Sequence, residues 1–212
     1  MKPERLILLL VLAVAVPAWS MGSKKAEKTD RERRLEADRL YNQGLSHRDK
    51  AWRYEREARE AEEKDRRVYL KSAEREYKRA SKALEKATQE DPDHHPAWGS
   101  LGYAYRKTGN YKKSLKAYDR SIALNDDYVE ALEYRAEAYL ALGRLKEARA
   151  DYAWVVAKDD RAARTFLQAA ATWISDARAD GRKRVKWADA AAFAAWVQEE
   201  QERLGPGEAR PW

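Results

Sequence analysis

The chain has 212 residues, of which 44% are hydrophobic and 37% charged, and it contains no cysteine. The lack of cysteine excludes disulfides, thiol catalysis and cysteine-containing metal sites. The net charge of +7 comes from positive and negative residues that are interleaved along the chain, whereas nucleic-acid-binding proteins more often concentrate their basic residues on one face. We therefore expect no nucleic-acid partner. Only nine Gly and six Pro accompany abundant Ala, Leu, Glu, Lys and Arg, a composition that predicts an all-α fold.

Residues 1–20 have the pattern of a signal peptide, with basic residues, an apolar run and small residues for cleavage. In order, these features are Lys2 and Arg5, the run 6–16, and Ala18 and Ser20. The run is shorter than the roughly 20 apolar residues that span a bilayer. We therefore expect cleavage after Ser20, or alternatively after Ala18, with no stable membrane insertion afterwards; an uncleaved anchor is the competing interpretation. Since no cysteine is present, a lipid-anchored lipoprotein is excluded, and the predicted location is periplasmic or secreted.

Residues 21–34 are small, polar and charged, and we predict a disordered lead-in there. Residues 35–94 are interpreted as a degenerate first copy of a repeat that becomes clear further along the chain. The segment 50–76 contains no Gly or Pro, so it predicts two lengthened helices rather than a long loop, with the break between them at 64–67. This charged hairpin extension could be an interaction arm or a merely solvated extension, and the sequence leaves both open.

The clearest pattern is a set of large, small and aromatic residues that recurs every 34 positions. The three sets are Trp98, Leu101, Gly102 and Tyr105, then Leu132, Arg135, Ala136 and Tyr139, then Phe166, Ala169, Ala170 and Trp173. The first set reads W-x2-L-G-x2-Y, and this region resembles the tetratricopeptide repeat (TPR) family. A generic helical bundle would explain the helical periodicity but not the constant spacing of 34. Arg135 replaces the leucine of the pattern, and we expect its stem along the groove wall and its charge in solvent.

The resemblance implies an all-α, right-handed helical solenoid with one TPR at 95–128 and another at 129–162. A half-repeat and a capping helix are predicted at 163–204, interrupted by a polar break at 176–186, and a flexible tail at 205–212. In the first copy, Gly44 and Ala80 are 36 positions apart, whereas their equivalents Gly102 and Ser114 are 12 apart, so 24 residues are inserted. The solenoid therefore begins with an elongated N-terminal hairpin.

The resemblance also implies a concave groove that binds a peptide or protein partner, lined by the first helix of each repeat. The residues that it places there are Tyr103, Arg106, Lys107, Glu130, Glu133, Glu137, Arg164 and Leu167, with Gly99, Leu140 and Ala171 beside them and Tyr41, Leu45 and Arg48 from the first copy. One wall is basic and aromatic and the next is acidic, so a segment carrying both charges is the expected ligand. The Lys and Asn set of chaperone-binding TPR domains is missing, and chaperone-tail binding is not expected. Two alternatives are that the groove is only solvated, or that the chain's own tail fills it.

The sequence contains no pattern typical of catalysis: no Gly-rich phosphate loop, H-E-x-x-H, G-x-S-x-G or calcium loop. His94 and His95 are adjacent, but the only other histidine is His47, so we predict turn residues and no metal. No catalytic residue and no cofactor is predicted. The favoured function is a non-enzymatic adaptor or scaffold of the cell envelope. The alternative is a structural or self-associating protein that forms homo-oligomers through the charged hairpin or the open end of the stack.

Overall fold

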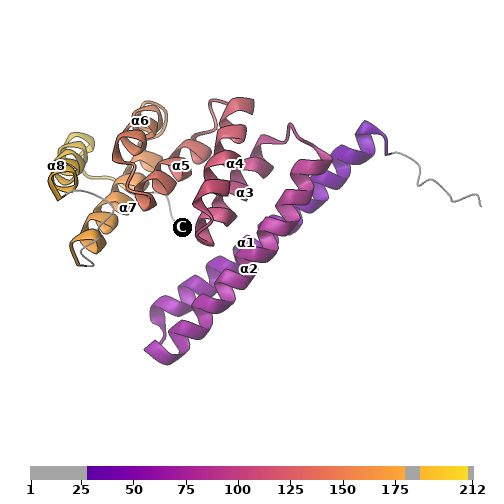
Figure 1. Ribbon diagram of the computed structural model, residues 1–212, viewed down its shortest axis with the longest axis horizontal. Helices are drawn as coiled ribbons and strands as arrows, with labels where there is room; N and C mark the ends of the chain where they lie inside the picture. Colours follow the sequence, from indigo (N-terminus) through magenta and orange to yellow (C-terminus); the bar gives the residue numbers. More distant parts are fainter. Residues whose placement is uncertain (1–27, 180–186, 210–212) are drawn as a thin grey trace, which may run out of the picture.

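The computed structural model describes residues 28–179 and 187–209, and this part of the chain forms eight α-helices and no strand. The helices are α1 (Asp30–Glu60), α2 (Glu63–Glu90), α3 (His95–Lys107), α4 (Tyr111–Leu124), α5 (Val129–Ala141), α6 (Leu145–Val156), α7 (Asp160–Ala179) and α8 (Trp187–Leu204). They stack in a row, and the lower end of the α1–α2 hairpin projects beyond it (Figure 1). The predicted all-α solenoid with an elongated N-terminal hairpin and a C-terminal capping helix is confirmed.

The two regular helix pairs have the same turn. Gly109 and Gly143 end α3 and α5 with positive φ angles of 75° and 71°, a conformation that glycine adopts without strain. In both turns the amide that follows the glycine donates back to a tyrosine carbonyl, from Asn110 to Tyr105 at 2.8 Å and from Arg144 to Tyr139 at 2.9 Å. The backbone conformation of the turn therefore repeats every 34 residues, as the sequence does.

A small residue lets the helices of a pair approach closely. A Cβ atom added to Gly102 would lie 2.6 Å from the ring of Tyr118, and one added to Gly44 would lie 2.6 Å from the side chain of Leu84. Leu84 stands 34 residues before Tyr118, so α1 and α2 pack against each other in the way that α3 and α4 do. The inserted residues lengthen this hairpin without changing its packing.

The helix α8 covers the end of the stack. Its Phe193 and Val197 are 2% exposed and belong to the apolar core formed with α5, α6 and α7. The rings of Trp173 and Phe193 meet edge to face, with their centroids 6.0 Å apart. Among the described residues, no helix is long and apolar enough to cross a membrane.

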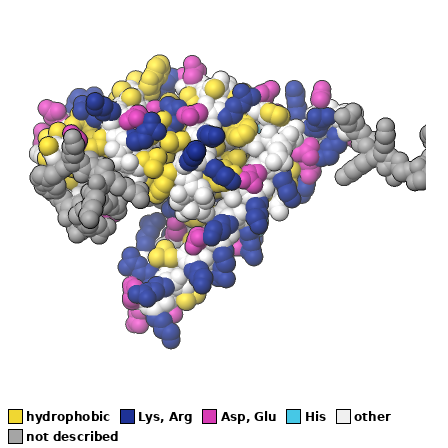
Figure 2. Space-filling view, in the orientation of Figure 1, with side chains coloured by type: hydrophobic (Ala, Val, Ile, Leu, Met, Phe, Trp, Pro, Cys, Tyr) yellow, Lys and Arg dark blue, Asp and Glu magenta, His cyan; other side chains and the backbone are white. Residues whose placement is uncertain are grey.

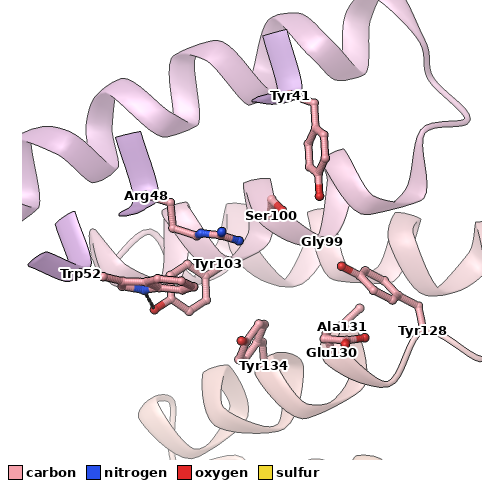
Figure 3. Close-up of a pocket in the computed structure, with 10 residues that line it drawn as sticks. All are labelled: Tyr41, Arg48, Trp52, Gly99, Ser100, Tyr103, Tyr128, Glu130, Ala131 and Tyr134. Carbon is pink, nitrogen blue, oxygen red and sulfur yellow. Dashed lines mark hydrogen bonds between the residues drawn. The ribbon is translucent and has the colours of Figure 1, made fainter. Parts of the chain in front are cut away.

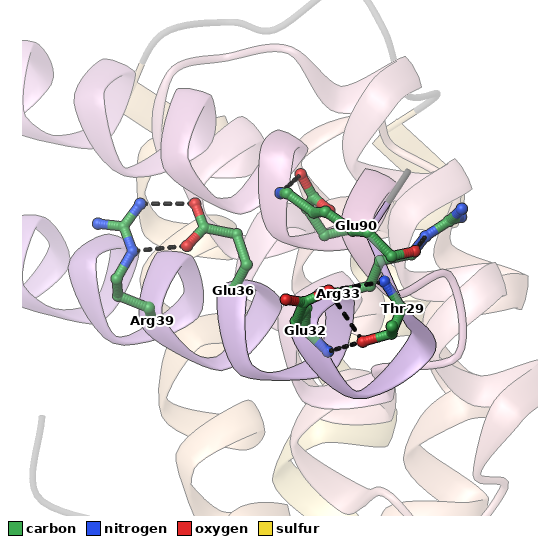
Figure 4. Close-up of polar contacts among 7 residues, drawn as sticks. Thr29, Glu32, Arg33, Glu36, Arg39 and Glu90 are labelled. Carbon is green, nitrogen blue, oxygen red and sulfur yellow. Dashed lines mark hydrogen bonds and ion pairs between the residues drawn. The ribbon is translucent and has the colours of Figure 1, made fainter. Parts of the chain in front are cut away.

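The start of α1 corrects the predicted lead-in, because residues 30–34 are helical. Thr29 caps the helix: its hydroxyl accepts from the Glu32 amide at 3.2 Å, and the Glu32 carboxylate accepts from the Thr29 amide at 2.8 Å (Figure 4). The ammonium group of Lys28 also binds Glu90, the last residue of α2, at 2.5 Å. The T-x-x-E capping box predicts this helix start. It was missed because residues 21–34 contain no apolar residues at helical spacing.

Other boundaries also differ from the predicted ones. The break in the hairpin was predicted at 64–67 but lies at 61–62, because Ala61 and Glu62 have extended backbones. The helix α7 continues to Ala179, so residues 176–179 are helical although a polar break was expected there. The predicted signal peptide 1–20, residues 21–27, the rest of the predicted break (180–186) and the tail end 210–212 lie outside the described residues.

Arg135 is held by two carboxylates instead of placing its charge in solvent. Its guanidinium donates two hydrogen bonds to Asp151 on α6, at 2.8 and 2.7 Å, and one to Asp119 on α4, at 2.7 Å. Burial raises the pKa of Asp151 above its usual range, although its hydrogen bonds to Arg135 oppose that shift. The two aspartates stand 16 residues before and after Arg135, so they hold the guanidinium between α4 and α6 instead of leaving it in solvent.

We expect Arg135→Leu to lower the free energy of unfolding by about 3–5 kcal/mol, because a buried carboxylate would lose its partner. Asp151 is only 5% exposed. The double variant Arg135→Leu/Asp151→Ala should recover most of the loss, since it leaves no unpaired buried charge. Urea unfolding followed by circular dichroism measures both, and a single variant as stable as the parent chain would contradict the expectation.

Candidate functional site

The first helices of the pairs line a concave groove that contains two neighbouring pockets. We call the first the aromatic pocket; its lining residues are Tyr41, Arg48, Trp52, Gly99, Ser100, Tyr103, Tyr128, Glu130, Ala131 and Tyr134 (Figure 3). We call the second the charged pocket, with a volume of about 280 Å³; its lining residues are Trp52, Glu55, Arg56, Arg59, Tyr103, Arg106, Lys107 and Glu137. Trp52 and Tyr103 belong to both pockets, so the two form one continuous surface across α1, α3 and α5.

Tyr103 is the centre of an aromatic cluster. Its ring lies 5.0 Å from that of Tyr134 and 6.0 Å from those of Trp52 and Tyr77, between centroids. The Trp52 indole N–H donates to the Tyr103 hydroxyl at 2.7 Å, the bond drawn in Figure 3. Tyr103 was predicted to line the groove, but it is only 4% exposed, so it supports the groove from below and offers little surface to a ligand. The half-buried indole of Trp52 covers it.

The charged pocket contains two ion pairs that join different helices. Arg106 on α3 pairs with Glu137 on α5, and Lys107 on α3 pairs with Glu55 on α1 at 2.6 Å. Burial lowers the pKa of Arg106, but the charge of Glu137 and the interactions with Tyr118 and Tyr103 together outweigh burial and raise that pKa above its usual value. The guanidinium therefore stays charged. Its Nε and one Glu137 carboxylate oxygen are buried without a hydrogen-bond partner in the described part of the chain.

Two further arginines give the charged pocket a positive surplus. Arg56 and Arg59 are exposed, line the pocket, and form no ion pair with any described residue. The two carboxylates of the pocket are already paired with Arg106 and Lys107. Lys and Arg side chains also gather along the projecting hairpin in the space-filling view (Figure 2). An anionic group entering from solvent would meet Arg56 and Arg59 first.

The structure brings together part of the predicted set. Tyr103, Arg106, Lys107 and Glu137 line the charged pocket. Glu130 lies in the aromatic pocket, as do Gly99, Tyr41 and Arg48 from the wider prediction.

Three predicted residues do not face the groove. Glu133 and Leu167 are only 1% and 2% exposed, and Leu167 belongs to the core that α8 completes. Arg164 donates to the backbone carbonyls of Leu204, at 2.8 Å, and Gly205. The start of the tail, predicted to be flexible, is therefore held against α7. The capping helix and the chain after it limit the groove to α1, α3 and α5.

The residues that the sequence reasoning missed come mainly from the hairpin extension. Trp52, Glu55, Arg56 and Arg59 lie at i, i+3, i+4 and i+7, the spacing of one helix face. That spacing could have identified them as a shared surface. It could not have shown that this face lies opposite α3, because the approach of α1 to α3 depends on the tertiary packing.

The histidines serve structural roles. His94 caps α3, because its Nδ1 accepts from the Ala97 amide at 3.1 Å. His47 contacts Glu76 across the hairpin at 2.7 Å. The described residues contain no group of three or more His, Cys, Asp or Glu that could hold a metal ion.

We expect Tyr103→Phe to lower the free energy of unfolding by about 1 kcal/mol, because the Trp52 indole N–H loses its acceptor. The control is Tyr111→Phe, which also removes a hydroxyl oxygen, because the Tyr111 hydroxyl bonds to no described residue. Urea unfolding compares the two variants. Equal midpoints would show that the bond between Trp52 and Tyr103 adds no stability.

Comparison with known proteins identifies a repeat in the centre of the chain. Residues 95–128 match the tetratricopeptide repeat family, at one of the places where the 34-residue spacing predicted a repeat. Human Superkiller complex protein 3 is 32% identical over 92 residues, which are 43% of this chain and 6% of that protein. The chain thus spans only a small part of the length of this curated relative.

Two solved structures are similar to the chain. The second TPR of Spaghetti (RPAP3), bound to the HSP90 peptide SRMEEVD, has 22% sequence identity and a TM-score of 0.41 and covers 58% of this chain and 99% of its own. A thermophilic TPR protein of Thermus thermophilus has 24% identity and a TM-score of 0.44, with 66% and 70% of the two chains covered. Tetratricopeptide repeats are typically non-enzymatic modules that mediate protein–protein interaction.

Proposed function

We propose that this chain is an exported, non-enzymatic adaptor whose concave groove binds an extended segment of a protein partner. The observation that carries the proposal is the charged pocket, where Arg56 and Arg59 are unpaired beside the indole of Trp52. Extended concave surfaces are the usual binding surfaces of helical-repeat proteins. Here the hairpin extension supplies one wall of that surface and α3 supplies the other.

The chemistry of the groove specifies the kind of segment that fits. The guanidinium groups of Arg56 and Arg59 suit carboxylates, with which arginine forms paired hydrogen bonds. The partly exposed ring of Trp52 suits an apolar or aromatic side chain. The two ion pairs of the pocket can exchange partners with a ligand that carries both charges. We therefore propose a segment in which acidic residues predominate and an apolar side chain lies between them.

A variant that reverses the two unpaired charges tests the groove. We expect peptides selected by the chain from a random library to bind the Arg56→Glu/Arg59→Glu variant about tenfold more weakly, because attraction becomes repulsion. The control Arg53→Glu/Arg66→Glu makes the same charge change at exposed hairpin residues outside both pockets and should bind as the parent chain does. Fluorescence anisotropy gives the affinities. Equal affinity for both variants would place the binding surface elsewhere.

Export of the chain is the second part of the proposal. It is supported by the basic residues, apolar run and small residues within 1–20, the order of features in a signal peptide. Cleavage after Ser20 would give a mature chain that begins at Met21 and still contains every residue of the groove. An adaptor of the cell envelope is the function that combines the two features.

We expect the protein recovered from cells to begin at Met21, which the intact mass of the purified protein shows directly. Replacement of Leu9 and Leu10 by Arg interrupts the apolar run, which export requires, and should leave the full-length chain inside the cell. A full-length chain in the envelope fraction would instead support the uncleaved anchor.

A further inference from the structure

A third cavity lies on a different face of α3, between α2 and α4. It is open to solvent, with a volume of about 440 Å³, and the partly exposed rings of Trp98 and Tyr105 line it. Leu101 and Ala117 also line it but are only 3% and 2% exposed. Lys113 and Lys116 of α4 stand on one side and Glu85 of α2 on the other. We call it the α2–α4 cleft. It shares no lining residue with the aromatic or the charged pocket, so the groove does not account for it.

The equivalent place in the next repeat contains an ion pair. Thirty-four residues on, Leu101 corresponds to Arg135, Ala117 to Asp151 and Glu85 to Asp119. There the guanidinium of Arg135 binds both aspartates and joins α4 to α6. In the α2–α4 cleft the central residue is a leucine and one of the two carboxylates is an alanine. The same place in the stack thus holds an ion pair in one repeat and apolar side chains in the other.

The charges around the cleft are specific to this repeat as well. Lys116 is exposed and pairs with no described residue, and the ammonium group of Lys113 lies 5.1 Å from the centre of the Tyr105 ring. The one carboxylate, Glu85, already accepts a hydrogen bond from the Tyr105 hydroxyl. In the next repeat Glu147 and Ala150 occupy the two lysine positions. The cleft therefore combines an apolar lining with a basic rim.

We propose that the α2–α4 cleft is a second binding site, for an acidic protein segment that inserts one leucine or aromatic side chain. The cleft volume lies in the range of ligand pockets, about 300–1,000 Å³. The partly exposed rings of Trp98 and Tyr105 provide the apolar surface against which such a side chain is buried. The lysines complement acidic residues on either side of it. This site is independent of the groove, so each can be present without the other.

The test uses a fluorescein-labelled peptide with the sequence Glu-Asp-Glu-Leu-Trp-Glu-Asp-Asp and the full chain. All measurements are made in the Arg56→Glu/Arg59→Glu background, which removes the attraction of the groove for acidic peptides. Fluorescence anisotropy should show saturable binding that weakens about tenfold in Lys113→Glu/Lys116→Glu, because both rim charges are reversed. Reversal of the exposed Lys146 and Arg53, which lie outside the cleft, should leave the affinity unchanged.

A second variant fills the cleft without changing its rim. Leu101→Arg/Ala117→Asp transfers the ion pair of the next repeat, with Glu85 in the place of Asp119, and should abolish binding while the circular dichroism spectrum stays helical. Substitution of Ser for Leu and Trp in the peptide should also abolish binding. Equal affinity for the Ser peptide, or for the Lys113→Glu/Lys116→Glu chain, would overturn the proposal, as would a lack of binding by the background chain.

Discussion

The close approach of two helices across a small residue is the contact on which the rest of this structure depends. In α3–α4 the backbone at Gly102 lies directly against the ring of Tyr118, and in α1–α2 that at Gly44 lies against Leu84. Any larger side chain would push the pair apart, because buried side chains are close-packed. With the two helices fixed in this way, each pair offers one face of its first helix to the groove and another to the space between second helices. Both candidate sites follow from that geometry.

The buried polar groups distinguish pairs that otherwise pack alike. Arg135 replaces an apolar residue of the repeat and is retained through its bonds to Asp119 and Asp151. Such a pair adds little stability compared with an apolar contact, but removal of one partner is costly. The pair of Arg106 and Glu137 likewise joins α3 to α5 beneath the groove. These ion pairs join neighbouring repeats, and their side chains fill space between the helices that apolar residues occupy elsewhere in the stack.

The sequence predicted the parts of the fold that depend on local spacing. The period of 34, the turn glycines Gly109 and Gly143 and the apolar face of α8 are properties of short segments, and the structure contains them. The groove was predicted less well because its composition depends on neighbours distant in the chain. Tyr103 was predicted to line the groove and does so, but it is only 4% exposed because it packs against Trp52 and other aromatic rings. Leu167 was expected in the groove, but it belongs to the core that α8 completes.

The hairpin extension has a consequence for how ligand choice could change in such a protein. Half of the charged pocket comes from residues of α1 that the repeat itself does not require. Arg56 and Arg59 are exposed and unpaired, so their replacement costs little stability and acts mainly on the ligand. The residues of α3, in contrast, serve the packing on several faces at once. The repeat therefore provides a rigid wall and the extension a variable one, and α3 lies between the groove and the α2–α4 cleft. Two segments of one partner that occupied both proposed sites would bind jointly more tightly than either segment alone.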